Sequence, residues 1–196
     1  MPRLTIELVP SSCWFSNVRS AVPESVWDKL KKTAYKLAHY RCEVCSGRGR
    51  QWPVEAHEVW HYDDKLHLQK LVRLIALCPM CHKVKHIGLA EVNGWLEESI
   101  QHLMKVNHWP DKVTATSYVK ESFRIWQERS KFDWTLDISA LAQYGITLKD
   151  IAVTKPLEDR VERNQQYEAT QTMLGGNTPE SDFDPYDHII GEERVA

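Results

Sequence analysis

Two Cys-x-x-Cys pairs are the strongest chemical signal in this sequence of 196 residues. Thiolates at that spacing can face one ion, and four of them can surround Zn²⁺ tetrahedrally with bonds of about 2.3 Å. In a reducing compartment such pairs favour a metal over disulfides, and neither pair has the strand-to-helix context of a redox motif. Chance pairing of four ordinary cysteines is the alternative. We predict a structural Zn²⁺ site with the ligands Cys42, Cys45, Cys78 and Cys81.

Three histidines close to these cysteines in the sequence could hold a second ion. His82 and His86 are four residues apart in a segment of helical character, so their imidazoles project from one helix face. Cys81 and His82 are about 100° apart around a helix axis, so one helix can face two sites. His57 could supply a third ligand or act as a base. The alternatives are that His82 or His86 replaces a cysteine at the zinc, or that these histidines are solvated.

The residues between and around these motifs predict the elements that position them. Gly47 allows a tight turn after the first cysteine pair. Residues 52–62 and 71–77 are rich in aromatic and β-branched side chains and indicate the two strands of a hairpin. The turn at Cys78 opens a helix that Gly88 would end. The expected order is a zinc knuckle, a hairpin and a helix.

Helices are expected on both sides of this module. Residues 3–9 alternate in polarity and predict a short strand. Apolar residues recur at helical spacing over 24–39, and further helices are expected at 91–106 and 113–130. The predicted fold class is therefore α+β, with flanking α-helices around a small metal module.

Composition divides the chain into four predicted segments. A strand and helix that pack on the core occupy 1–40, the zinc module occupies 41–89, and an α-helical appendix occupies 90–153. The last segment, 154–196, holds four basic and ten acidic residues and has a net charge of −6. Its polar composition cannot offset chain entropy, so we predict a disordered acidic tail. The rest of the chain has a net charge of +4.

Composition also bounds the class of protein. A hydrophobic content of 42% is enough to build a core. No apolar run approaches the roughly 20 residues needed to cross a bilayer. The N-terminus lacks the layout of a secretory signal, so we expect a cytoplasmic protein with no membrane partner.

Residues 42–88 contain the strings Cys42-Glu-Val-Cys45, Val54-Glu-Ala-His57-Glu58-Val59 and Leu77-Cys78-Pro-Met-Cys81-His82-Lys-Val-Lys-His86. Through these strings the segment resembles the HNH endonucleases, a family with a ββα-metal fold on a treble-clef zinc frame. The resemblance implies a structural Zn²⁺ and a second divalent ion (Mg²⁺, Mn²⁺, Ni²⁺ or Zn²⁺) held by a strand residue, His82 and His86. It also implies hydrolysis of DNA phosphodiester bonds, with a hairpin histidine activating water.

The first strand departs from the family pattern, which has adjacent His-His or Asp-His where this chain has His57-Glu58. If His57 is a ligand, Glu58 or His61 is the base. If His57 is the base, Ala56 stands where a ligand should be. We prefer the first assignment, because Val59 then takes the apolar position that follows the pair.

A second departure concerns the Asn that the family has about five residues before the third cysteine. That position falls near Arg73 in this chain, where there is no Asn. A degenerate zinc module that binds nucleic acid or a protein partner is therefore the alternative, and a purely structural zinc protein within a larger complex is a third. The oligomeric state is open, although cutting both strands would need a dimer or two successive nicks. Basic residues that could contact DNA phosphates are Arg48, Arg50, Arg73, Lys83 and Lys85.

Overall fold

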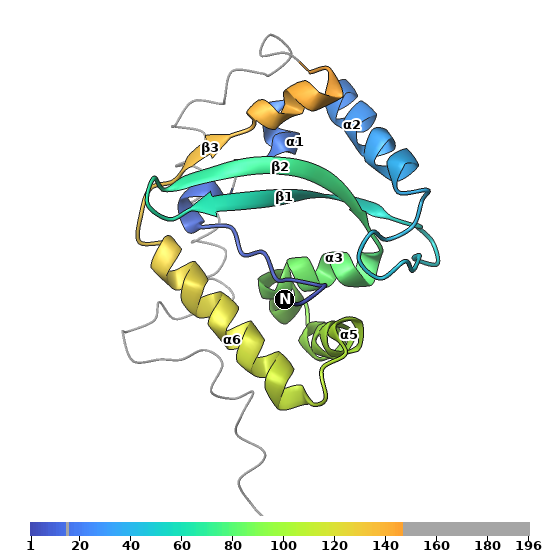
Figure 1. The fold of residues 1–196 in the computed structure, drawn as a ribbon, viewed down its shortest axis with the longest axis vertical. Coiled ribbons are helices and arrows are strands. Elements are labelled where there is room, and N and C mark those ends of the chain that lie inside the picture. The colour runs from blue at the N-terminus through green and yellow to red at the C-terminus, as the bar shows by residue number, and fades with distance from the viewer. Residues whose placement is uncertain (15, 147–196) are drawn as a thin grey trace, which may run out of the picture. The chain divides into compact units, whose positions relative to one another are not determined.

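The computed structural model describes residues 1–14 and 16–146, which form a mixed α+β fold around a small sheet (Figure 1). Strands β1 (Glu55–Asp63) and β2 (Leu68–Leu77) form an antiparallel hairpin. Strand β3 (Thr135–Asp137) runs parallel to β2 at its outer edge. The predicted α+β class and the hairpin are confirmed.

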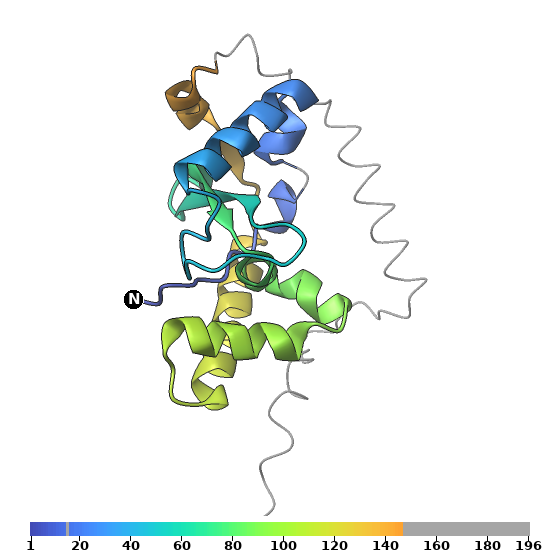
Figure 2. The same ribbon diagram turned by 90° about the vertical axis from the view of Figure 1, so that its right-hand side faces the viewer.

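Helices cover both faces of this sheet (Figures 1 and 2). On one face lie α1 (Val18–Ala21), α2 (Glu24–Leu37) and the 3-10 helix η2 (Ser139–Tyr144), which share a core with the hairpin. A further 3-10 helix, η1 (Ser11–Cys13), precedes α1. The buried residues of this core are Val18, Val22, Trp27, Leu30, Ala34, Trp60, Leu71, Leu74, Leu141 and Ile146.

The other face carries the α-helices that follow the hairpin in sequence, as Figure 1 shows for α3, α5 and α6. These are α3 (Pro79–Lys85), α4 (Ile87–Val92), α5 (Leu96–Asn107) and α6 (Lys112–Arg129). Helix α5 packs against α3, α4 and α6, so α3 lies between α5 and the hairpin. Side chains buried on these helices include Val84, Ile87, Ile100, Leu103 and Val119.

The predicted strand over 3–9 is wrong. The segment is not part of the sheet, because its backbone groups bond to a side chain and to a helix end instead of to a neighbouring strand. Asn107 accepts a hydrogen bond from the Leu4 amide at 2.8 Å and donates one to the Leu4 carbonyl at 2.9 Å. The Glu7 amide donates to the Lys85 carbonyl at 3.1 Å. The N-terminal segment is thereby fixed alongside α3 and α5.

The helices after the cysteine pair differ in detail from the prediction. Gly88 does not end the first of them; the break falls at His86, whose backbone leaves helical geometry (φ −103°, ψ 49°) before α4 begins. The predicted helix over 91–106 is divided, because Gly94 takes a positive φ of 72° after α4. The helices predicted at 24–39 and 113–130 are confirmed to within two residues.

Two sequence predictions stay predictions. The acidic tail, 154–196, lies outside the described residues, and the division into four segments has no test in the structure. Within the part of the chain that the structure describes, no helix is long and apolar enough to span a membrane.

Candidate metal centres

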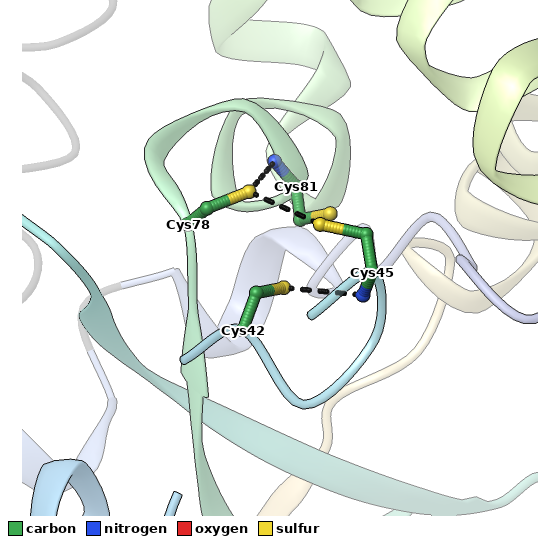
Figure 3. A group of neighbouring side chains, drawn as sticks. All are labelled: Cys42, Cys45, Cys78 and Cys81. Carbon is green, nitrogen blue, oxygen red and sulfur yellow. Dashed lines mark hydrogen bonds between the residues drawn. The ribbon is translucent and has the colours of Figure 1, made fainter. Parts of the chain in front are cut away.

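The structure brings the two Cys-x-x-Cys pairs together at the start of α3. Their four sulfur atoms lie within 4.8 Å of one another, and those of Cys45 and Cys78 are 3.6 Å apart. The side chains point toward a common centre (Figure 3). Four sulfurs at about 2.3 Å from one tetrahedral ion would be about 3.8 Å apart. This four-cysteine cluster (Cys42, Cys45, Cys78 and Cys81) can hold a structural metal ion.

Backbone amides of the two turns point at the sulfurs. The amide of Cys45 donates to Cys42 Sγ, and that of Cys81 donates to Cys78 Sγ, both at 3.5 Å (Figure 3). The Gly47 amide donates to Cys45 Sγ at 3.4 Å. The sequence suggested that Gly47 makes the first turn possible, but the residue with left-handed backbone geometry is Ser46 (φ 61°). Gly47 instead leaves room for sulfur, since a Cβ there would lie 3.2 Å from Cys45 Sγ.

Crowding perturbs the ionisation of these thiols. Hydrogen bonds from Cys78 and Cys81 lower the pKa of Cys42, whereas sharing a proton with the Cys42 thiolate raises the pKa of Cys78 to about 12. The pKa of Cys81 is raised for the same reason. Sulfurs this close cannot all carry negative charge unless a cation lies between them. The donor set therefore fits a divalent ion such as Zn²⁺.

Two contacts that the sequence did not indicate brace this cluster. His102 of α5 places Nε2 3.2 Å from Cys81 Sγ, and burial lowers the pKa of His102, so a neutral ring can donate its N–H to the sulfur. Glu43, between the first two cysteines, accepts hydrogen bonds from the Ala76 amide at 2.9 Å and from Arg73 at 2.7 Å. The turn is thus joined to β2, and Arg73 is engaged within the protein.

A second cluster lies between the hairpin and α3. His57 of β1, His82 of α3 and His86 at the end of that helix offer nitrogen atoms within 4.8 Å of one another. Their ring centroids are 4.8–5.3 Å apart. The structure therefore brings together the three histidines that the sequence selected, and we name them the histidine cluster.

Two carboxylates orient the histidine cluster. Glu7 Oε2 lies 2.8 Å from His57 Nε2, and Glu55 Oε2 lies 2.5 Å from His82 Nδ1. Such carboxylate–histidine pairs fix the ring and leave the other nitrogen for a ligand. His57 Nδ1 is buried and has no hydrogen-bond partner among the described residues. A buried nitrogen without a partner is costly, so its presence beside two further imidazoles fits a metal ion.

Burial favours the uncharged form of two histidines of the cluster, His57 and His86. Burial lowers the pKa of His86 to about 3, and repulsion from His57 and His82 adds to this effect. Burial also lowers the pKa of His57, outweighing the opposite effect of Glu7. Burial alone would raise the pKa of Glu7, but its hydrogen bond to His57 and the charge of Lys85 lower it. Neutral imidazoles beside an ionised carboxylate are the state that binds cations.

The two candidate bases named from the sequence do not join this cluster. Glu58 points to the opposite face of the hairpin, where its carboxylate accepts a hydrogen bond from the Val18 amide at 3.2 Å. Burial there raises the pKa of Glu58. His61 is exposed and lies four residues along β1 from His57, a distance of about 13 Å.

The predicted DNA contacts divide into two groups. Lys85 is only 4% exposed and its Nζ bonds to Thr5 at 2.7 Å and to Glu7 at 3.2 Å, so the prediction that it contacts DNA is corrected. Lys83 pairs with Glu98 at 2.5 Å, and Arg73 with Glu43. By contrast, both arginines that follow the first cysteine pair, Arg48 and Arg50, are exposed.

Sequence spacing missed four residues that support the clusters: Glu7, Glu43, Glu55 and His102. Strand alternation could have found Glu55, because it lies two residues before His57 and so on the same face of β1. No local signal could have found Glu7 or His102, since each meets its partner through the tertiary fold.

Comparisons with protein-family models, curated proteins and solved structures found no match to this chain.

Replacing Cys78 by Ser should remove the ion from the four-cysteine cluster and destabilise the fold, because a structural zinc contributes directly to folding. Metal content by mass spectrometry and thermal unfolding with and without EDTA measure both effects. Cys13→Ser is the matched control, since Cys13 is a buried cysteine outside the cluster. Equal metal content in the two variants would contradict the assignment.

The histidine cluster should make stability depend on pH. The pKa of His86 lies near 3 in the folded protein against 6.5 ordinarily, so the unfolded chain binds more protons between these values. The free energy of unfolding should therefore fall as pH drops below about 6.5, by up to about 1.4 kcal/mol per pH unit for this one group. Denaturant titrations at several pH values should show a flatter dependence for His86→Gln. Equal slopes would show that burial does not control this histidine.

Proposed function

We propose that this chain is a zinc-stabilised, metal-dependent endonuclease of the HNH type that hydrolyses DNA phosphodiester bonds. The observation that carries the proposal is the histidine cluster, in which His57 Nδ1 is buried, has no hydrogen-bond partner among the described residues and lies beside the imidazoles of His82 and His86. Two members of the four-cysteine cluster, Cys78 and Cys81, lie at the start of the helix that carries His82, so one element would contribute ligands to a structural and a catalytic ion.

The order of elements supports a treble-clef ββα-metal frame. A cysteine turn precedes the β1–β2 hairpin, and the second cysteine pair opens α3 directly after β2. Cys78 precedes the first residue of α3 and its sulfur accepts the Cys81 amide, so the metal site and the helix start coincide. Because the helix starts at the cysteines, its next turn carries His82 to a position where the imidazole contacts Glu55 of β1.

The chemistry proposed for the histidine cluster follows from its donors. A divalent ion held by His57, His82 and His86 would supply Lewis acidity to the scissile phosphate and ease deprotonation of water. Three imidazoles suit Ni²⁺ or Zn²⁺ better than Mg²⁺, which prefers oxygen ligands. Glu7 and Glu55 hold His57 and His82 in the tautomers that present their free nitrogens.

Glu55 is the carboxylate best placed to accept the proton of the attacking water. It shares a strand face with His57, it is half-buried, and it reaches the cluster through His82 Nδ1. Glu58 cannot take this role, because its carboxylate lies on the other face of the sheet. We therefore propose Glu55 as the base in place of Glu58 or His61.

The proposal is tested by conversion of supercoiled plasmid to nicked circles by purified zinc-loaded protein. We expect nicking with Ni²⁺, Mn²⁺ or Zn²⁺ that EDTA abolishes and that His82→Ala reduces by at least about 10²-fold. His61→Ala is the matched control, because this exposed histidine of β1 lies outside the cluster. Absence of nicking with every metal, by a folded zinc-loaded protein, would contradict the proposal.

Glu55→Gln should lower the nicking rate by about 10²–10⁴-fold, the usual contribution of a general base. The amide oxygen can still accept a hydrogen bond from His82, so the ion content should not change. Glu58→Gln should leave the nicking rate unaltered. The side-chain carbonyl oxygen of the glutamine can still accept the hydrogen bond from the Val18 backbone amide on the other face of the hairpin. A rate lost in Glu58→Gln but kept in Glu55→Gln would reverse the assignment.

A second candidate is a zinc module that binds nucleic acid without cutting it. The observation in its favour is that neither Glu58 nor His61 reaches the histidine cluster. A DNA mobility shift at low salt without nicking would support this function over the first.

A further inference from the structure

A basic cavity lies beside the four-cysteine cluster, and no member of the histidine cluster lines it. It has a volume of about 610 Å³ and is formed by four parts of the chain that are distant in sequence. These are the N-terminal segment, the loop after Cys45, the start of α3 and the end of α5. We name it the basic cleft, after its charged and titratable lining residues Arg3, Arg48, Arg50, His102, Lys105 and His108.

The cleft concentrates positive charge that no carboxylate of the described residues neutralises. No aspartate or glutamate lines it. Its four formal cations form no ion pair with a carboxylate in the described part of the chain, whereas Lys83, Lys112 and Arg129 elsewhere on the surface all do. An uncompensated set of this kind attracts anions.

Two of these cations are already held in place. Arg3 donates to the Val44 carbonyl at 3.0 Å, and Arg48 donates to the His39 carbonyl at 3.1 Å. Each guanidinium has five N–H donors, so most remain for an oxyanion. A fixed guanidinium loses little conformational freedom when it binds a phosphate.

Compensation of the metal cluster is a simpler role for the cleft, but it accounts for only part of the charge. Four thiolates around one Zn²⁺ carry a net charge of −2, which leaves two of the four cations in excess. The sulfurs also receive hydrogen bonds from backbone amides and lie beside His102, and no cation of the cleft bonds to a sulfur.

The cleft and the histidine cluster both adjoin α3, at different points along its axis. Met80, in the first turn, lines the cleft, and His86 ends the helix. Six residues of helix span about 9 Å. Phosphates of one DNA strand are spaced at about 3.4 Å along the duplex axis, so about three nucleotides cover this distance.

We infer that the basic cleft binds the phosphate backbone of the DNA strand that crosses the histidine cluster. Arg3, Arg48, Arg50 and Lys105 would contact successive phosphates and position the scissile bond over α3. This inference rests on the proposed function for its choice of ligand. It adds Arg3 and Lys105 to the two arginines that the sequence indicated.

The test measures binding to a fluorescein-labelled DNA duplex by anisotropy, over a range of salt concentrations. The full chain carries His82→Ala throughout, so that cleavage is suppressed during the measurement. A variant with Arg48→Ala, Arg50→Ala and Lys105→Ala is compared with one carrying Lys29→Ala, Lys32→Ala and Lys36→Ala. The second set removes the same charge from exposed positions of α2.

The cleft variant should bind at least about tenfold more weakly at 0.1 M salt. The slope of its log binding constant against log salt concentration should be less steep, by an amount equivalent to the loss of up to about three phosphate contacts. The α2 variant should bind nearly as the parent does, and all three proteins should hold equal zinc. Equal weakening by both sets, zinc loss confined to the cleft variant, or no binding by the parent would overturn the inference.

Nicking by the unmutated chain is assayed separately, so the two claims can fail independently. Loss of binding confined to the cleft variant, without nicking by any form, would reject the nuclease and keep the DNA-binding cleft. Nicking that is unaffected by the cleft substitutions would keep the nuclease and reject the cleft.

Discussion

The rest of the structure depends on one constraint, the close approach of the Cys42 and Cys45 sulfurs to those of Cys78 and Cys81 at the start of α3. Cys78 stands at the helix start and Cys81 lies one residue before His82, so fixing the sulfurs also fixes the direction in which the histidines project. His102 and Glu43 brace this junction from α5 and from the turn itself. The structural centre thus orients the proposed catalytic one.

The N-terminal segment has a comparable role on the other side of α3. Glu7 bonds to His57 of the hairpin and to Lys85 of the helix, and its backbone amide bonds to the same helix end. One carboxylate therefore links three elements around the histidine cluster. Because Glu7 and Lys85 are nearly enclosed, their ion pair resists screening by salt more than surface pairs do.

Local spacing was enough to find both clusters, because two Cys-x-x-Cys turns and a pair of histidines one helical turn apart need no tertiary information. Alternation along β1 also separated Glu58 from His57, yet the family pattern suggested Glu58 as a base. The structure follows the alternation. Lys85 and residues 3–9 were misjudged because their partners lie far away in the sequence. A polar, alternating segment predicts a strand equally well whether or not a strand edge is available to it.

The central claim is that α3 carries two separate metal centres, and native mass spectrometry of the full chain after loading with Zn²⁺ and Ni²⁺ tests it most directly. The account predicts two ions per chain, of which His57→Ala loses one while the four-cysteine ion stays. One ion per chain in the unmutated protein, unaffected by that substitution, would contradict it.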